Sequence, residues 1–189
     1  MKQHVCPFWI GYLLACPLRR WLEPYDDALE DLVGSDMTVV DIGSAMGYYS
    51  LEMARRVGPK GRVIAVDLQP RMLEVLGRRA VRAGVADRIE TRACSSENLG
   101  LADLASQADF VLATHVVHET PDGADTLRQA YDVLKPGGVL VLTEPIGHIT
   151  EKMFDKTRTW ARDAGFDEVR ADLRRRSWAA TFRKLPPGQ

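Results

Sequence analysis

The sequence is poor in cysteine: it has three in 189 residues, Cys6, Cys16 and Cys94, and none lies at a spacing typical of zinc sites. An odd number of isolated cysteines argues against a disulfide framework and indicates a reducing compartment. Long apolar runs are absent as well, since no stretch approaches the length of a membrane span. We therefore expect a cytoplasmic protein without a membrane partner, a disulfide framework or a bound metal.

An excess of charge of one sign is also lacking. The net charge is −1, so the molecule as a whole has no field that would attract nucleic acid or an anionic membrane. A basic stretch near the C-terminus is interrupted by acids, and we interpret it as a solvated strand face: Arg170, Arg174, Arg175, Arg176, Arg183 and Lys184. The composition thus gives no reason to expect a nucleic-acid partner.

The first residues loosely resemble a short signal sequence with a lipoprotein cleavage box at residues 13–16. Pro7 and Gly11 interrupt its apolar run, however, and Leu14 is large where a small residue is usual. We favour an amphipathic helical cap over residues 1–35, packed on a single domain at residues 36–189. A chain of this length can bury one proper core but not two.

The most informative stretch is a β-branched run, residues 38–42, followed by a turn of small residues that contains Gly43 and Gly47. A second β-branched run, residues 62–67, also ends in an acid, Asp67, just as Asp41 stands at the tip of the first. Two parallel strands with a glycine turn after the first and an acid closing the second form half of a nucleoside site. The acid at the second tip suits the two hydroxyls of a ribose.

Strands alternate with helices along the rest of the chain, which predicts a parallel sheet with right-handed crossovers. The predicted strands are 38–42, 62–67, 88–94, 109–114 and 139–143, and 168–173 and 177–185 form a closing antiparallel hairpin. The predicted helices are 46–57, 70–83, 122–134 and 151–164, the third ended by residues 135–138. The second should turn Met72, Leu73, Leu76, Ala80 and Val81 inward.

Two other nucleotide sites are excluded by missing glycines or lysines. A nicotinamide site would need glycines at positions 43, 45 and 48, but Ala45 and Tyr48 occupy the last two. A phosphate loop ending in Gly-Lys-Ser/Thr does not occur.

Five pieces in order carry a family resemblance: Val-Val-Asp41-Ile-Gly43-Ser-Ala-Met-Gly47, Val-Ile-Ala-Val-Asp67-Leu, Ser96-Glu97-Asn98-Leu99, Ala108-Asp109-Phe-Val-Leu and Leu134-Lys135-Pro136-Gly137-Gly138-Val-Leu. Over residues 36–185 the chain resembles the class I S-adenosylmethionine-dependent methyltransferases of the small-molecule type. The resemblance implies an α/β, Rossmann-like, doubly wound and mostly parallel seven-stranded sheet with a C-terminal antiparallel β-hairpin. It also implies S-adenosyl-L-methionine as the cofactor and S-adenosyl-L-homocysteine as its product.

The resemblance places the cofactor site residue by residue. Asp41, Gly43, Ser44 and Gly47 would hold the amino-acid end, Asp67 the ribose, and Leu68 and Met72 the adenine. Ser96 and Glu97 would read the adenine edge, with Ser95 where the family often has aspartate, and Thr114, His115 and Val117 would lie beside the methyl group. Tyr49 is a further candidate for contact with the cofactor or the acceptor. The family usually has glycine where Ala45 stands, and alanine is tolerated there only if its φ is negative.

Methyl transfer is an in-line displacement, so the protein needs a general base only if the acceptor must lose a proton. The candidates follow the fourth and fifth strands: His115, His118, Glu119 and Glu144. We favour His118 with Glu119 as the catalytic pair, because neutral imidazole is a usable base near neutral pH. The alternative is that His118 only orients a loop.

The acceptor is expected to be a small molecule, since aromatic residues precede the first strand where this family often has a lid: Phe8, Trp9, Tyr12, Trp21 and Tyr25. These residues equally fit plain packing. Arsenic-methylating relatives bind their substrate through thiolates, but the spacing of the three cysteines does not support that role. Two other functions stay open: a non-catalytic protein that binds S-adenosylmethionine or S-adenosylhomocysteine, and a protein or RNA methyltransferase with a partner subunit. The oligomeric state is left open.

Overall fold

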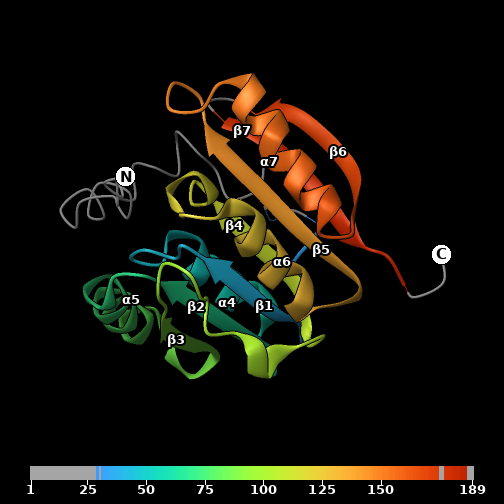
Figure 1. The fold of residues 1–189 in the computed structure, drawn as a ribbon. Helices are drawn as coiled ribbons and strands as arrows, with labels where there is room; N and C mark the ends of the chain where they lie inside the picture. Colours follow the sequence, from blue (N-terminus) through green and yellow to red (C-terminus); the bar gives the residue numbers. More distant parts are fainter. Residues whose placement is uncertain (1–28, 30, 175–176, 187–189) are drawn as a thin grey trace.

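The computed structural model describes residue 29, residues 31–174 and residues 177–186. Seven strands form one sheet in the order β3-β2-β1-β4-β5-β7-β6 (Figure 1). Their bounds are β1 Thr38–Ile42, β2 Arg62–Asp67, β3 Ile89–Ala93, β4 Ala108–Thr114, β5 Leu134–Pro145, β6 Phe166–Arg174 and β7 Ser177–Lys184. The first five run parallel, and β7 pairs antiparallel with both β5 and β6. This confirms the predicted Rossmann-like sheet with its closing hairpin.

Helices cover both faces of this sheet. They are α4 Tyr48–Val57, α5 Pro70–Ala83, α6 Gly123–Val133 and α7 Glu151–Asp163, with 3-10 turns η1 Ala86–Arg88, η2 Ala102–Leu104 and η3 Val117–Glu119. Side chains of α4 and α5 pack with one set of strand residues, and side chains of α6 and α7 pack with the other. Figure 1 shows α6 and α7 lying over the half of the sheet that contains β4 and β5. Two apolar cores result, one on each face of the sheet.

Two details differ from the predicted elements. Val81 is 70% exposed, whereas Val75 is buried with the other inward residues of α5. Strand β5 begins at Leu134, because Ala108 pairs with Leu134 and Phe110 with Val139, so residues 135–138 form an irregularity inside the strand rather than a loop before it. The helices predicted before residue 29, and their aromatic side chains, lie outside the described residues.

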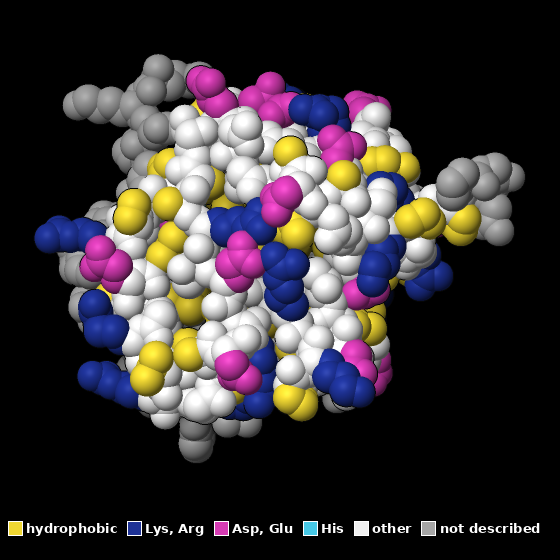
Figure 2. Space-filling model, turned by 90° about the horizontal axis from the view of Figure 1, so that it is seen from below, with side chains coloured by type: hydrophobic (Ala, Val, Ile, Leu, Met, Phe, Trp, Pro, Cys, Tyr) yellow, Lys and Arg dark blue, Asp and Glu magenta, His cyan; other side chains and the backbone are white. Residues whose placement is uncertain are grey.

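Charged side chains on the edge of the sheet near β3 are paired. Arg62 contacts Glu90 at 2.6 Å, and Arg92 contacts both Glu90 and Asp103 at 2.6 Å. Figure 2 shows a face on which basic and acidic side chains are interspersed. Nearby carboxylates therefore offset the positive charge that β2 and β3 present.

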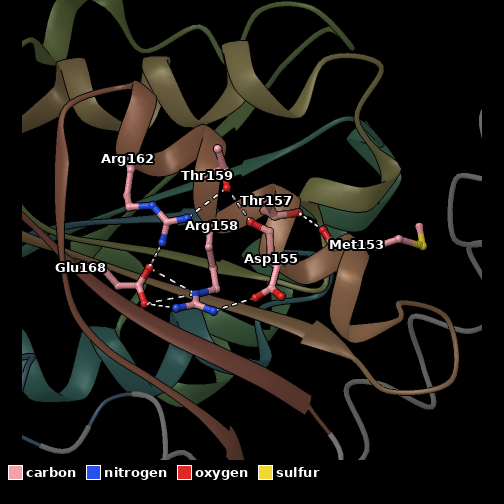
Figure 3. A network of polar contacts seen from close by, with 7 residues as sticks. All are labelled: Met153, Asp155, Thr157, Arg158, Thr159, Arg162 and Glu168. Carbon is pink, nitrogen blue, oxygen red and sulfur yellow. Dashed lines mark hydrogen bonds and ion pairs between the residues drawn. The ribbon is translucent and has the colours of Figure 1, made fainter.

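A polar network joins α7 to the outermost strand, β6 (Figure 3). The carboxylate of Glu168, on β6, accepts hydrogen bonds from Arg158 and from Arg162, which lies 2.7 Å away. Asp155 binds the far side of the Arg158 guanidinium at 2.7 Å. Glu168 is largely covered, with a side-chain exposure of 15%, so solvent screens these contacts less than it screens a surface ion pair.

Replacing Glu168 with glutamine is expected to lower the free energy of unfolding by about 1 kcal/mol, because two arginines lose their shared anion. For a chain of this size the melting temperature should fall by about 2–4 °C, measured by thermal denaturation. Asp132→Asn is the matched control, since Asp132 pairs with Arg128 on one exposed helix face. Equal melting temperatures for the two variants would show that the network does not fasten α7 to β6.

Candidate active site

The turn after β1 is built from left-handed backbone. Gly43, Ala45 and Gly47 have φ values of 74°, 46° and 80°. Ala45 therefore does not have the negative φ that was expected to be necessary for alanine at this position. The N–H of Ala45 donates a 2.8 Å hydrogen bond to Asp67, and this bond helps to offset the cost of left-handed alanine, about 1–2 kcal/mol.

Both glycines of this turn are enclosed by side chains from elsewhere. A Cβ on Gly43 would lie 2.7 Å from Val116, and a Cβ on Gly47 would lie 2.7 Å from Leu76. Val116 follows β4 and Leu76 belongs to α5, so the turn lies between these two segments. Packing therefore requires glycine at positions 43 and 47, whether or not a ligand also approaches the backbone there.

Two acids lie at the carboxyl ends of adjacent strands, as predicted, and both are buried: Asp41 is 2% exposed and Asp67 is 8% exposed. Asp41 accepts a hydrogen bond from the Ser50 hydroxyl at 2.5 Å. The two oxygens of Asp67 accept the N–H groups of Ala45 and Gln69, each at 2.8 Å. Burial raises the pKa of Asp67 above its ordinary value, although both N–H groups act in the opposite direction. Ser50 was missed from sequence, since a helical serine is usually solvated.

Within the described part of the chain, three buried hydroxyls along this edge have no hydrogen-bond partner: those of Ser44, Thr114 and Thr143. Ser44 lies in the glycine turn, and Thr114 and Thr143 are register partners on β4 and β5. Buried polar groups are nearly always hydrogen-bonded, so unpartnered hydroxyls indicate groups that a ligand would satisfy. Ser44 and Thr114 are two of the residues predicted to hold the cofactor.

The predicted adenine residues lie just after β2, in the first turn of α5 and in the loop after β3. Leu68 is 36% exposed beside Asp67, whereas Met72 is 1% exposed and packs with Met46 and Val75. Of the two, Leu68 has the more accessible apolar surface.

The loop after β3 is held by its own turn and by α6. The hydroxyl of Ser95 accepts the N–H of Asn98 at 3.0 Å, and Gln129 of α6 binds the carbonyl of Glu97 and the N–H of Leu99. Ser96 is half-buried, and Ser95 and Glu97 are exposed. The loop therefore presents its predicted residues from a fixed backbone, anchored by a glutamine that sequence reasoning missed.

Tyr48 and Tyr49 begin α4, directly after the turn. Their rings meet edge to face, with centroids 5.0 Å apart. Tyr48 is buried, and the half-buried Tyr49 packs against the core formed by α4 and α5. Tyr49 thus has a packing role in addition to its predicted contact.

Histidines follow β4 at the same edge. His115 has a φ of 55°, and its Nε2 lies 2.9 Å from the hydroxyl of Ser177. His118 contacts Glu144 through its ring Nδ1 and through its backbone N–H, the latter at 3.1 Å. The partner of the His118 ring is therefore Glu144 of β5, whereas Glu119, the partner favoured from sequence, is half-buried on the same turn.

Opposing effects act on the His118 ring. Burial lowers its pKa, but the hydrogen bond and charge of Glu144, with the charge of Glu119, outweigh burial. The pKa of His118 consequently lies above its ordinary value.

Cys94 is the cysteine that the described residues contain. Burial and the charge of Asp67 raise the pKa of its thiol to about 11, so it is protonated at neutral pH. Cys6 and Cys16 lie outside the described residues. Within the described part of the chain, no cluster of three metal-ligating side chains occurs, and no helix is long and apolar enough to cross a membrane.

The family model described as a methyltransferase domain matches residues 34–178, which include the turn, both acids and the histidines. The chain belongs to the S-adenosylmethionine-dependent methyltransferase family. An arsenite methyltransferase of Halobacterium salinarum is 32% identical over 58% of this chain and 27% of the relative. A ubiquinone/menaquinone biosynthesis C-methyltransferase of Hahella chejuensis is 30% identical over 65% of this chain and 50% of the relative. The chain thus spans half or less of the length of these two family members.

Solved structures of the same fold include other members of the family. A methyltransferase from Aquifex aeolicus has a TM-score of 0.84 at 20% identity and covers 96% of this chain and 100% of its own. A structure from Methanococcus maripaludis has a TM-score of 0.78 at 16% identity, with 98% of both chains covered. At these identities the likeness concerns the fold alone.

Proposed function

We propose that this protein is a methyltransferase that transfers a methyl group from S-adenosyl-L-methionine to a small-molecule acceptor. The observation that carries the proposal is the buried carboxylate of Asp67 beside a left-handed glycine turn on the adjacent strand. A carboxylate has about four acceptor sites, so two backbone N–H groups leave Asp67 with capacity for two ribose hydroxyls. The relatives named for arsenite and for quinone biosynthesis support an acceptor of small size.

The residues at this edge fit the cofactor. Asp41, Gly43, Ser44, Gly47 and Tyr49 would surround its amino-acid end. The hydroxyl of Ser44, which has no partner among the residues that the structure describes, is available to bind it. Asp67 would hold the ribose, and the adenine would lie among Leu68, Met72, Ser95, Ser96 and Glu97. Thr114 and His115 would lie nearest the reacting methyl group.

When bound, the cofactor supplies a methyl group on a positively charged sulfur, transferred by in-line displacement. The residues of the chain would hold the acceptor in line with the methyl group and exclude water. Such positioning supplies most of the rate enhancement in a reaction of this kind. His118, with Glu119 on the same turn, is the proposed proton acceptor. A proton acceptor matters only where the acceptor atom carries a proton that must leave.

Calorimetric titration with S-adenosyl-L-methionine and with S-adenosyl-L-homocysteine tests the cofactor assignment. Transfer of labelled methyl groups to quinols, other phenols, thiols, trivalent arsenic and lipid-like acceptors then tests catalysis. Binding without transfer to any acceptor would favour a non-catalytic binding protein. Transfer only in the presence of a co-purified partner would favour a protein or RNA methyltransferase.

Cofactor affinity is expected to fall as the pH is lowered, and to begin falling at a higher pH than an ordinary aspartate would cause. The ionised carboxylate of Asp67 makes the stronger hydrogen bonds to ribose. Because burial raises its pKa, the carboxylate takes up a proton at a higher pH than an ordinary aspartate does, and affinity should fall as the pH decreases through that value. Calorimetry from pH 7 downward measures the effect. The decline should be absent in Asp67→Asn, and an equal decline in that variant would place the titrating group elsewhere.

A further inference from the structure

Glu144 is a fully buried carboxylate whose hydrogen bonds are made to one residue. It is 0% exposed, and among the described residues its donors are the backbone N–H and the ring Nδ1 of His118. Burying a carboxylate without a partner costs several kcal/mol of folding free energy. The hydrogen bonds from His118 offset a substantial part of that cost for Glu144 on β5. An ionised carboxylate only accepts hydrogen bonds, so Nδ1 carries the proton and the lone pair of neutral His118 lies on Nε2.

The turn that carries His118 lies against the proposed cofactor site. Val116, two residues before His118, packs so closely on Gly43 that a Cβ there would lie 2.7 Å away. The neighbouring Val117 is buried at 2% exposure, which fixes the turn on the core. The side chain of His118 is 19% exposed, so its ring is fixed in orientation but still accessible from outside the protein.

We propose that Glu144 is a positioning residue that holds His118 with Nε2 as the proton acceptor for an acceptor hydroxyl of phenol- or enol-like acidity. The inference rests on the proposed methyltransferase function. The hydroxyl proton moves to Nε2, and the acceptor, at its oxygen or the conjugated carbon, forms a bond to the methyl carbon as the carbon–sulfur pair returns to sulfur. A carbon acceptor then loses its own proton to solvent. The imidazolium that forms is stabilised by the charge of Glu144.

The pKa of the acceptor group determines how much such a base helps. A phenol has a pKa of about 10, roughly three units above that of an imidazole, a gap of about 4–5 kcal/mol. A thiol already ionises by a few per cent near neutral pH and needs little help. An alcohol, with a water-like pKa of about 16, is so weakly acidic that proton transfer to imidazole ahead of methyl transfer is far less favourable than for a phenol.

Glu144 is the main partner of His118, because the other polar groups on the neighbouring elements bind elsewhere or act on His118 only through their charge. Glu119 lies on the same turn and adds a negative charge. His115, at the end of β4, contacts Ser177. At the start of α6, the side chain of Asp122 caps the helix by accepting the N–H of Asp125. The Asp125 carboxylate in turn is held by Arg128 and Gln129.

A titration without any acceptor tests the positioning role. The ring C–H signals of the histidines are followed by NMR against pH, and the His118 signal is assigned by its loss in His118→Gln. In the native protein its midpoint should lie above 6.5, the ordinary histidine value. Glu144→Gln should lower the midpoint by about one pH unit, and Glu144→Asp should restore much of it. The exposed Glu74→Gln, on α5 at the other face of the sheet, is the control and should not move it. A native midpoint at or below the ordinary value overturns the inference even if Glu144→Gln does not fold.

Rate measurements test the catalytic consequence. With a phenolic or enolic acceptor, Glu144→Gln should lower the plateau of kcat by about tenfold and shift the acid limb of the pH profile to lower pH. A loop anchor would lower the plateau without moving the limb. Transfer only to thiols, trivalent arsenic or amines overturns the acceptor class. If the native protein fails to bind S-adenosyl-L-methionine, the proposed function fails, and the NMR result still decides the role of Glu144.

Discussion

Replacing Asp67 with alanine is expected to weaken binding of S-adenosyl-L-methionine by about 100-fold or more. Each hydrogen bond from a ribose hydroxyl to an ionised carboxylate contributes about 1.5–3 kcal/mol, so the loss of two amounts to at least about 3 kcal/mol. Calorimetric titration of the purified variant measures the loss directly.

The contacts of Asp67 within the protein decide how this experiment must be controlled. Asp67→Ala also frees the N–H groups of Ala45 and Gln69, so part of the effect would come from a loosened turn. Asp67→Asn keeps the volume and one acceptor oxygen, and its affinity should be intermediate. Asp109→Asn is the matched control: Asp109 likewise accepts a backbone N–H, from Thr38 at 2.9 Å, but at the start of β4, the opposite end of the sheet. Native-like affinity in Asp67→Ala, with unchanged affinity in Asp109→Asn, would remove Asp67 from the site.

Local patterns predicted most of the scaffold. The structure confirms the order of strands and helices, the antiparallel hairpin and the burial of Asp41 and Asp67 at strand ends. These features could be predicted because short stretches of sequence are enough to indicate a buried strand or the start and end of a helix. The start of β5 was predicted wrongly, because residues 135–138, Lys-Pro-Gly-Gly, are of types that usually form a turn. Pairing of Leu134 with Ala108, a contact between distant positions, extends the strand through them.

The details of the site depend on contacts that no local pattern contains. Ala45 adopts a left-handed conformation, and its N–H meets Asp67, a residue 22 positions along the chain. The ring of His118 contacts Glu144, 26 positions away. The sequence shows which residue types lie at the strand ends. Strand order and the faces on which the side chains lie decide which carboxylate contacts which imidazole ring.

Replacing Gly43 with alanine is expected to lower the free energy of unfolding by about 2–5 kcal/mol. Left-handed backbone costs alanine about 1–2 kcal/mol, and crowding of a packed site adds about 1–3 kcal/mol. The crowding arises because the new Cβ would lie 2.7 Å and 2.8 Å from two carbons of Val116, one of them attached to the backbone and unable to rotate away. The melting temperature should fall by about 5–15 °C, measured by thermal denaturation.

Gly137→Ala separates the two causes. Gly137 has a φ of 85°, also left-handed, but apart from its two chain neighbours no described residue has an atom within 4 Å of its added Cβ. It should therefore carry the conformational cost alone, about 1–2 kcal/mol. Shortening Val116 to alanine in the Gly43→Ala background should then recover part of the lost stability, because the two sites are coupled by direct contact. If Gly43→Ala and Gly137→Ala lose equal stability and Val116→Ala brings no recovery, segment 115–119 does not rest on the glycine turn, and His118 loses its structural link to the cofactor site.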